Sequence, residues 1–203
     1  KSNKVVSYTG LEPSSKTYNG LLNLTKDFGK TKKIKIHLLG SEVFYEKELY
    51  DLCLTSPPYF DKEKYSNEST QSFIKFPTKD KWYNGFLKNT IKNCFDSLRQ
   101  NGVFIFNIKD TKSLPDFIEK TKKYAKEVGF VFKDTLALEL ATQTFMKAKN
   151  KEEVNYFSSS AFNPVKFSHL LTITSQYFGS NSIMKQSKLC FSPAIKVLPE
   201  PPK

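Results

Sequence analysis

The sequence predicts an α/β fold in which a mostly parallel sheet carries helices on both faces. Three observations support this prediction. Short runs of β-branched and aromatic residues alternate along the chain with segments whose apolar residues recur at helical spacing. Glycine or proline follows most of these runs, which marks where each element ends. With 203 residues, of which 38% are hydrophobic, the chain is long enough for one sizeable core.

The elements of the N-terminal half follow from these signals. Strands are predicted at residues 5–11 and 34–39, each ended by a proline or glycine turn, with a helix over residues 14–29 between them. A third strand covers residues 49–54 and runs into two prolines. Residues 60–81 are polar and lack a clear period, so a long loop is predicted. Long loops inside compact domains are usually functional or disordered.

Alternation of strand and helix continues after this loop. Four further elements are predicted: a helix over residues 81–98, a buried strand over 103–108, a helix over 114–129, and one strand or a pair over 130–140. The rest of the chain has little regular period. We therefore expect a core over residues 1–140 and an irregular C-terminal extension over residues 141–203, which either recognises the target or completes the core.

The net charge of +12 favours a polyanionic partner, because neutralising phosphates releases counterions. The alternative is that lysine simply supplies the solvating charge, since Arg99 is the only arginine. No apolar run reaches the length of a membrane span, and no secretory signal is visible. An intracellular protein without membrane contact is therefore expected, in the cytoplasm of a bacterium or of a virus-infected cell.

The three cysteines, Cys53, Cys94 and Cys190, lie far apart and form no CxxC pair. Their odd number argues against a disulfide framework and their spacing argues against a zinc site, so no metal is expected. Cys53 lies in an apolar strand-like run and Cys94 on an apolar helix face. Both are therefore predicted to be buried small hydrophobic residues.

The third predicted strand runs directly into Ser56-Pro57-Pro58-Tyr59. Each proline fixes its own φ and restricts the residue before it, so the turn at the end of the strand is rigid and extended. It presents a hydroxyl, backbone carbonyls and an aromatic ring in a fixed arrangement. In sheets of this kind ligands bind beyond the carboxyl ends of the strands. The alternative is a Pro-Pro turn that merely ends a strand.

This arrangement suits methylation of an exocyclic amino group. The lone pair of such a nitrogen is delocalised into the base, so the nitrogen is a poor nucleophile. The Ser56 hydroxyl and the Pro57 carbonyl can accept its hydrogens and favour a pyramidal nitrogen. The Tyr59 ring offers a face for a base that is flipped out of the duplex. No covalent intermediate is needed, so a catalytic cysteine is not expected.

The motif resembles the catalytic motif of the S-adenosylmethionine-dependent amino-methyltransferases of DNA, in which Asp, Asn or Ser precedes Pro-Pro and an aromatic residue. With Thr55 in front, it is similar to the N4-cytosine enzymes and to a subset of the N6-adenine enzymes. The resemblance covers roughly residues 5–140. It implies a Rossmann-like methyltransferase sheet, S-adenosylmethionine as the cofactor and double-stranded DNA as the partner, as in restriction–modification. Ser56, Pro57, Pro58 and Tyr59 are then the catalytic residues.

The resemblance also assigns residues to the cofactor. Glu12, between a predicted strand and a predicted helix, matches the acidic residue that binds the ribose hydroxyls in this family. Ser41 and Glu42 follow the next strand, where the family usually has an Asp that contacts the adenine. Ser41 departs from that preference, and Glu42 is the substitute. Thr55 belongs to the same cofactor-binding set. The alternative for Glu12 is a solvated turn residue.

The loop after the motif carries basic residues interleaved with aromatic rings and amides, which is what a segment in contact with a nucleic-acid strand needs. Phe60, Lys62, Lys64 and Tyr65 are the predicted nucleic-acid contacts. Residues of the same kinds continue along the loop at Asn67, Gln71, Lys75, Lys79 and Lys81. The alternative is a solvated loop in a lysine-rich protein.

A glycine-rich loop is missing from the sequence. Members of the family hold the methionine part of the cofactor with a Phe-x-Gly-x-Gly loop after their first, central strand, and none of the eight glycines here forms such a loop. The first predicted strand matches the family's second, so the central strand is expected to be missing and to leave two inner edges unpaired. Three explanations are open: an upstream segment supplies the loop, a second chain supplies it, or the protein is a non-catalytic homologue.

Two functions of different classes follow. The first is transfer of a methyl group from S-adenosylmethionine to N6 of adenine or N4 of cytosine in DNA. The alternative is a non-catalytic nucleic-acid-binding subunit with the same fold. An amino-methyltransferase that acts on RNA or protein is a further alternative, because Pro-Pro-Tyr after a strand also occurs in such enzymes. The base and the recognition sequence do not follow from the motif.

Overall fold

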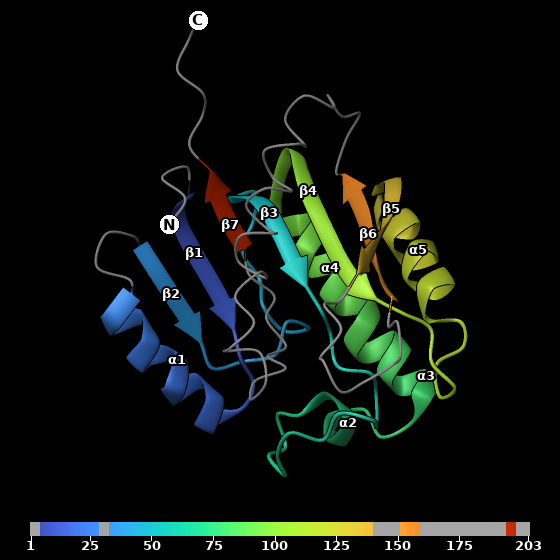
Figure 1. The fold of residues 1–203 in the computed structure, drawn as a ribbon, viewed down its shortest axis with the longest axis horizontal. Helices are drawn as coiled ribbons and strands as arrows, with labels where there is room; N and C mark the ends of the chain where they lie inside the picture. The colour runs from blue at the N-terminus through green and yellow to red at the C-terminus, as the bar shows by residue number, and fades with distance from the viewer. Residues whose placement is uncertain (1–4, 29–32, 140–150, 159–193, 198–203) are drawn as a thin grey trace, which may run out of the picture.

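The computed structural model describes residues 5–28, 33–139, 151–158 and 194–197, which form one seven-stranded sheet with helices beside it (Figure 1). Along the chain the elements are β1 (Val5–Leu11), α1 (Ser15–Phe28), β2 (Lys33–His37), β3 (Tyr50–Thr55), α2 (Ser72–Lys75), α3 (Lys79–Lys81), the π-helical turn η1 (Trp82–Leu87), α4 (Lys88–Ser97), β4 (Leu98–Ile108), α5 (Phe117–Val128), β5 (Val131–Glu139), β6 (Lys151–Ser158) and β7 (Ala194–Val197). No helix in this described part of the chain is long and apolar enough to span a bilayer.

The strand order in the sheet is β2-β1-β7-β3-β4-β6-β5. β1 pairs parallel with β2, and β3 pairs parallel with β4, whereas β7 and β6 run antiparallel to both of their neighbours. β1 to β5 therefore all point the same way, and their carboxyl ends lie at one edge of the sheet (Figure 1). The predicted α/β fold with a mostly parallel arrangement of its strands is confirmed.

The centre of the sheet is buried on both faces. Residues 103–106 of β4 are all buried, and so are Leu52 and Cys53 of β3. Successive side chains of a strand point to opposite faces, so burial of consecutive residues requires cover on both sides. This explains why the sequence of β4 is a continuous apolar run instead of an alternating one.

The helix boundaries agree with their sequence signals. Ser14 precedes α1, and its carbonyl accepts the first helical hydrogen bond, from the Tyr18 amide at 2.8 Å. α5 ends at Gly129, whose φ of 109° is the left-handed conformation that favours glycine at this position. α1 lies beside β2, while α4 and α5 lie side by side next to β4 and β5 (Figure 1).

The region between β3 and β4 differs from the prediction in two ways. The predicted loop contains the short helices α2 and α3, and β4 begins at Leu98 instead of residue 103. The longer strand forms because Leu98 is paired with Tyr50 at the start of β3. The register of the two strands shifts after this pair, and Asn101 takes up the irregularity with a φ of 65°.

The position between β1 and β3 is the one where a strand is expected to be missing. β7 occupies it and pairs with both inner strands, with Tyr8 opposite Ile195 and Cys53 opposite Ala194. The expectation of two unpaired inner edges is therefore wrong, because a four-residue segment of the C-terminal extension supplies backbone partners to both strands. Among the described residues no parallel strand lies at this position.

Two strands of the sheet come from the C-terminal extension, residues 141–203. β6 pairs with both β4 and β5, and β7 pairs with β1 and β3. Both strands are thus continuous with the sheet of residues 1–140. The rest of the extension, including Cys190, lies outside the described residues. The predicted role of the extension in target recognition falls on these residues.

Candidate active site

The segment Ser56-Pro57-Pro58-Tyr59 follows β3 directly, at the edge of the sheet where the parallel strands end (Figure 1). Thr55 and both prolines are buried, whereas Ser56 and Tyr59 are half-buried. The buried prolines hold the backbone in place, so a hydroxyl and an aromatic ring are the groups of this turn that remain partly open to solvent. In sheets of this kind that edge is where ligands bind.

The ring of Tyr59 is held at two points. The Lys109 amide, directly after β4, donates a hydrogen bond of 3.0 Å to the Tyr59 hydroxyl. The buried Phe117 ring at the start of α5 lies edge-on to the Tyr59 ring, with 5.6 Å between centroids and an interplanar angle of 81°. The orientation of the Tyr59 ring is therefore set by two elements outside the motif.

Phe60 turns the chain sharply after the motif. Its φ of 49° lies in the left-handed region that residues with a Cβ rarely adopt. The half-buried Phe60 ring packs edge-on against the buried Trp82, with 6.1 Å between centroids. Such a conformation persists only where the surroundings hold it, and the contact with Trp82 supplies that support. The side chain predicted to contact nucleic acid is thus partly used for packing.

The other three predicted nucleic-acid contacts face solvent. Lys62, Lys64 and Tyr65 are all exposed, with 43% of Tyr65 accessible. The Lys64 ammonium lies 5.7 Å from the centre of the Phe73 ring, which is a cation–π contact at an exposed site. These residues follow the motif in sequence and present positive charge and an aromatic surface that a polyanion can reach.

Glu12 is the buried carboxylate at the end of β1. Only 4% of the residue is exposed, its amide donates to the His37 carbonyl at 3.0 Å, and its Oε1 accepts from the Ser14 amide at 2.8 Å. Burial raises the pKa of Glu12 to about 7, because desolvation disfavours the charged form more strongly than the Ser14 hydrogen bond favours it; the nearby Glu68 carboxylate raises it further. The alternative of a solvated turn residue is therefore wrong.

Glu42, after β2, is also buried, and its carboxylate pairs with Lys75. The Lys75 Nζ lies 2.9 Å from Glu42 Oε1, and the Glu42 side chain is 4% exposed. The other oxygen, Oε2, lies against Gly40, where a Cβ would be only 2.1 Å away. Glycine at position 40 is thus what lets this carboxylate fold back on its own turn.

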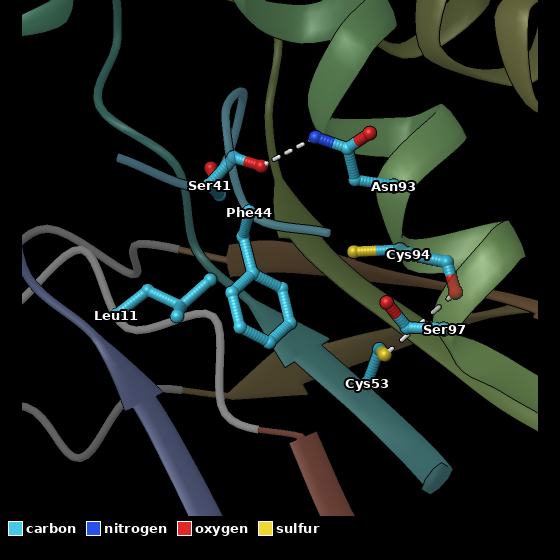
Figure 2. A pocket seen from close by; sticks show the side chains of 7 residues that line it. All are labelled: Leu11, Ser41, Phe44, Cys53, Asn93, Cys94 and Ser97. Carbon is cyan, nitrogen blue, oxygen red and sulfur yellow. Dashed lines mark hydrogen bonds between the residues drawn. The ribbon is translucent and has the colours of Figure 1, made fainter. Parts of the chain in front are cut away.

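Ser41 is turned towards α4. Its Oγ lies 2.8 Å from Thr90 Oγ1, and its carbonyl accepts a hydrogen bond of 3.0 Å from the Asn93 side chain (Figure 2). These two bonds fix the turn after β2 on α4. The neighbouring carboxylate of Glu42 is therefore carried on an anchored backbone.

A loop that starts after Phe60 runs from the end of β3 to the ends of strands β1 and β2. We call its residues 61–78 the bridging loop. Glu68 accepts hydrogen bonds from the amide and the hydroxyl of Ser15, at the start of α1. Thr70 donates to the carbonyl of Pro13 at 2.7 Å, and Lys75 pairs with Glu42. The bridging loop therefore connects the end of β3 to the ends of β1 and β2.

The sequence does not indicate the role of Glu68, and it groups Gln71 and Lys75 with the other polar and basic residues of the loop. In the structure Gln71 is buried and Lys75 pairs with Glu42. Lys109 was also missed, because its contribution comes from the backbone amide. For Glu68, the sequence offers one signal. Ser14-Ser15 before a predicted helix indicates that a carboxylate is favoured at the start of that helix, but it does not indicate which carboxylate.

A small cavity lies below this edge, between Leu11, Ser41, Phe44, Cys53 and residues of α4 (Figure 2). Its volume of about 10 Å³ leaves room for about one water molecule, so it holds no cofactor. The Cys53 thiol donates to the Cys94 carbonyl at 3.9 Å, and this contact, together with burial, raises the pKa of the thiol well above its ordinary value. Both cysteines are buried, as predicted, and a raised pKa disfavours the thiolate form of Cys53.

Comparison with known proteins bears on the fold. No protein-family model and no curated protein matches the amino-acid sequence. The N-methyltransferase NodS from Bradyrhizobium japonicum, in complex with S-adenosyl-L-homocysteine, matches with a TM-score of 0.50 and 11% identity, over 75% of this chain and 66% of NodS. An S-adenosylmethionine-dependent methyltransferase from Methanosarcina mazei matches with a TM-score of 0.50 and 12% identity, over 77% of this chain and 83% of its own. This chain has a methyltransferase fold.

The methyltransferase sheet predicted from the motif is thereby confirmed. A putative methyltransferase from Thermoplasma acidophilum matches equally well, with a TM-score of 0.50 and 11% identity over 75% of this chain. The chain spans 57% of the length of that protein and, as stated, 66% of NodS. At identities this low, the structural likeness shows how the helices and strands are arranged, and it shows nothing about the substrate.

Proposed function

We propose that this protein transfers a methyl group from S-adenosylmethionine to an exocyclic amino group of a DNA base, either N6 of adenine or N4 of cytosine. The observation that carries the proposal is the placement of Ser56-Pro57-Pro58-Tyr59 at the carboxyl end of β3 in a methyltransferase fold. NodS, which shares the fold, was crystallised with S-adenosyl-L-homocysteine, and this supports the choice of cofactor.

The base side of the proposed site uses the motif. The Ser56 hydroxyl and the Pro57 carbonyl accept the hydrogens of the target amino group, which localises the nitrogen lone pair for attack. The Tyr59 ring stacks on the base once the base is flipped out of the duplex. Because the Lys109 amide and the Phe117 ring already orient Tyr59, the stacking face is preformed and little ordering is needed when the base arrives.

The cofactor side uses the ends of β1 and β2. When bound, S-adenosylmethionine supplies an electrophilic methyl group carried by a sulfonium. The Glu12 carboxylate fits the ribose, because a carboxylate has about four acceptor positions and the Ser14 amide uses one of them. Hydroxyl donors would also offset the desolvation that raises the pKa of Glu12. Ser41, Glu42 and Thr55 complete this side.

The nucleic-acid side uses the exposed start of the bridging loop. Lys62 and Lys64 supply positive charge, and Phe60 and Tyr65 supply rings beside the motif. The net charge of +12 favours a double-stranded DNA partner through phosphate contacts. We propose that these contacts hold the duplex over the end of β3, where the base is flipped towards Tyr59.

A second candidate is a nucleic-acid-binding module without catalysis. It is favoured by β7, which runs antiparallel between β1 and β3, where the family's parallel strand and glycine-rich loop are expected. The enzyme proposal accommodates this observation if an upstream segment or a second chain supplies the loop. The two candidates differ in a measurable property, because only the first requires that S-adenosyl-L-homocysteine bind.

Methylation of plasmid DNA tests the proposal. The protein is incubated with a plasmid and S-adenosylmethionine, and modified bases are located by single-molecule sequencing. We expect Ser56→Ala and Tyr59→Ala to lower the rate by about 100-fold or more, as for the loss of a group that acts in the transition state. The exposed residues Ser69 and Tyr45 provide matched controls, and Ser69→Ala and Tyr45→Ala should retain the rate. Full activity in the two motif variants would overturn the catalytic assignment.

Calorimetry separates the two candidates. Titration with S-adenosyl-L-homocysteine should show binding that Glu12→Gln weakens, because a neutral amide is a poorer acceptor for two hydroxyls than a carboxylate. The non-catalytic module would bind a DNA duplex but would neither bind S-adenosyl-L-homocysteine nor methylate the plasmid, also when the segment or second chain that supplies the glycine-rich loop is present.

A further inference from the structure

The bridging loop (residues 61–78) carries the predicted nucleic-acid contacts at one end and pairs with the proposed cofactor side at the other. Lys62, Lys64 and Tyr65 lie near its start and are exposed. Lys75 lies near its end and is paired with the buried Glu42. The same segment therefore touches two regions that the proposed reaction must bring together.

The first tie of the loop is the Glu68 carboxylate. Its two oxygens accept from the Ser15 amide at 3.0 and 3.3 Å, and one of them also accepts from the Ser15 hydroxyl. The Ser66 hydroxyl donates to Oε2 at 2.8 Å. These hydrogen bonds, with Ser15 the largest cause, lower the pKa of Glu68 to about 2, so the carboxylate is charged at neutral pH. A charged acceptor at the first residue of α1 also interacts favourably with the helix dipole.

The second tie is the ion pair between Lys75 and Glu42. Glu42 is almost fully buried in the turn after β2, so its charge needs a partner, and the Lys75 Nζ at 2.9 Å supplies one. Breaking the pair would leave a buried carboxylate without its counter-ion. The ion pair with Glu42, on the cofactor side, therefore holds the loop in place.

Thr70, Ser72 and Phe76 of the loop make further contacts, between Glu68 and Lys75 and just after Lys75. Thr70 donates to the Pro13 carbonyl at 2.7 Å, one residue after Glu12. Ser72 accepts from the Trp82 indole at 3.2 Å, and the Phe76 ring lies where a Cβ on Gly85 would be 2.3 Å away. The loop is thus seated on η1 at one end and tied to β1, α1 and β2 along its length.

We propose that Glu68 and Lys75 are positioning residues that hold the bridging loop on the ends of β1 and β2 and so couple ligand binding at Glu12 and Glu42 to nucleic-acid contact at Lys62 and Lys64. The identity of the two ligands rests on the proposed function. Because coupling between two sites is reciprocal, S-adenosyl-L-homocysteine should tighten DNA binding by the same factor by which DNA tightens binding of S-adenosyl-L-homocysteine.

Hydrogen exchange without ligands tests the positioning role independently of the reaction. Peptides covering residues 61–78 are followed by mass spectrometry in Glu68→Gln and Lys75→Met. We expect about tenfold faster exchange in the loop of each variant, as for the loss of one charge-assisted tie, with exchange of β3 and β4 unchanged. Lys75→Arg keeps the charge and should restore slow exchange.

Matched controls come from the same loop. Asp61→Asn removes the same charge as Glu68→Gln, and Lys79→Met, at the neighbouring start of α3, removes the same charge as Lys75→Met; both positions are exposed. Neither control should change exchange in the loop. Unchanged exchange in Glu68→Gln and Lys75→Met, or equal acceleration in the controls, would overturn the positioning role.

Binding measurements then test the coupling. Affinity for a fluorescein-labelled DNA duplex is measured with and without saturating S-adenosyl-L-homocysteine in the wild type and in Glu68→Gln. We expect the ligand to tighten DNA binding about tenfold in the wild type and to lose this effect in the variant. Binding of both ligands without mutual influence would reject the coupling and leave the proposed function standing. Absence of S-adenosyl-L-homocysteine binding, also when the segment or second chain that supplies the glycine-rich loop is present, would reject the coupling and the catalytic proposal together. The exchange result would still decide the positioning role.

Discussion

The base side and the cofactor side of the candidate site are held by different forces. On the base side, two buried prolines, the buried Phe117 ring and the buried Trp82 fix the positions of Tyr59 and Phe60. On the cofactor side, Glu12 and Glu42 are buried carboxylates held by hydrogen bonds and one ion pair. Apolar packing is non-directional and nearly independent of pH, whereas a buried charge costs free energy that depends on pH and on its partners.

This difference assigns distinct tasks to the two sides. The stacking surface of Tyr59 can be complete before any ligand arrives, since packing against Phe117 and the hydrogen bond from the Lys109 amide set it. The carboxylates on the other side gain from any ligand that brings hydroxyl or amino donors, because such donors offset their desolvation. The base side is therefore expected to respond to changes of volume, and the cofactor side to changes of charge and pH.

The largest effect is expected from Phe117→Ala on the base side. Phe117 is fully buried and touches the rings of Tyr59, Trp82 and Phe106. Its truncation should lower the free energy of unfolding by about 3–5 kcal/mol, as measured by urea denaturation. Phe132→Ala is the control, because Phe132 is 43% exposed, and we expect a loss below about 1 kcal/mol. Equal losses would show that the ring cluster does not support this side.

The next effect is a pH dependence that comes from Glu12 on the cofactor side. Its pKa in the folded protein is about 7, above its ordinary value of 4.5, so between these values the folded state binds more protons than the unfolded state. Stability should therefore fall as pH rises from about 4.5 to about 7, by at most about 3 kcal/mol from this group.

The variant Glu12→Gln isolates this contribution. Urea midpoints of the wild type and of Glu12→Gln are compared at pH 5 and pH 7.5, and the difference between the proteins should favour the variant at the higher pH. Glu68 contributes in a separate window, because its pKa is lowered to about 2 and its stabilisation is lost only as pH falls from about 4.5 towards 2. The same difference at both pH values would mean that Glu12 is not desolvated.

The smallest expected change in stability comes from replacing either of two glycines, Gly85 and Gly20, by alanine. A Cβ at Gly85 would lie 2.3 Å from the Phe76 ring, which anchors the bridging loop, whereas a Cβ at Gly20 in α1 has nothing within 4 Å. Gly85→Ala should therefore destabilise by about 1–3 kcal/mol through overpacking. Gly20→Ala should stabilise by about 1 kcal/mol through helix propensity. Thermal melts of the two variants should shift in opposite directions, and a shift in the same direction would contradict the close approach of Phe76.

Much of the fold could be predicted because the signals are local. The Ser14 start and the Gly129 end of two helices depend on a few neighbouring residues, and both are where the sequence places them. The continuous apolar run of β4 indicates a central strand by itself. β7 could not be predicted, because four residues carry little periodic signal and their place is decided by the backbone groups that β1 and β3 leave unpaired.

The candidate site shows the same division. The motif at Ser56 to Tyr59 is predictable, since two prolines fix their own geometry at the end of an apolar strand. The tie between Glu68 and Ser15 joins residues 53 positions apart, and nothing in either sequence neighbourhood specifies the other. The Lys109 amide that orients Tyr59 is equally invisible, because a backbone donor has no sequence signature.

Trp82 gives this protein a built-in optical reporter. It is the only tryptophan in the chain, and it is fully buried. Its indole N–H donates to Ser72 in the second half of the bridging loop, and its ring touches Phe60 just after the motif. Indole emission shifts to longer wavelength when the ring meets water. Movement of the segment between Phe60 and Ser72 can therefore be followed in the unlabelled protein by stopped-flow fluorescence, on the timescale on which ligands arrive and leave.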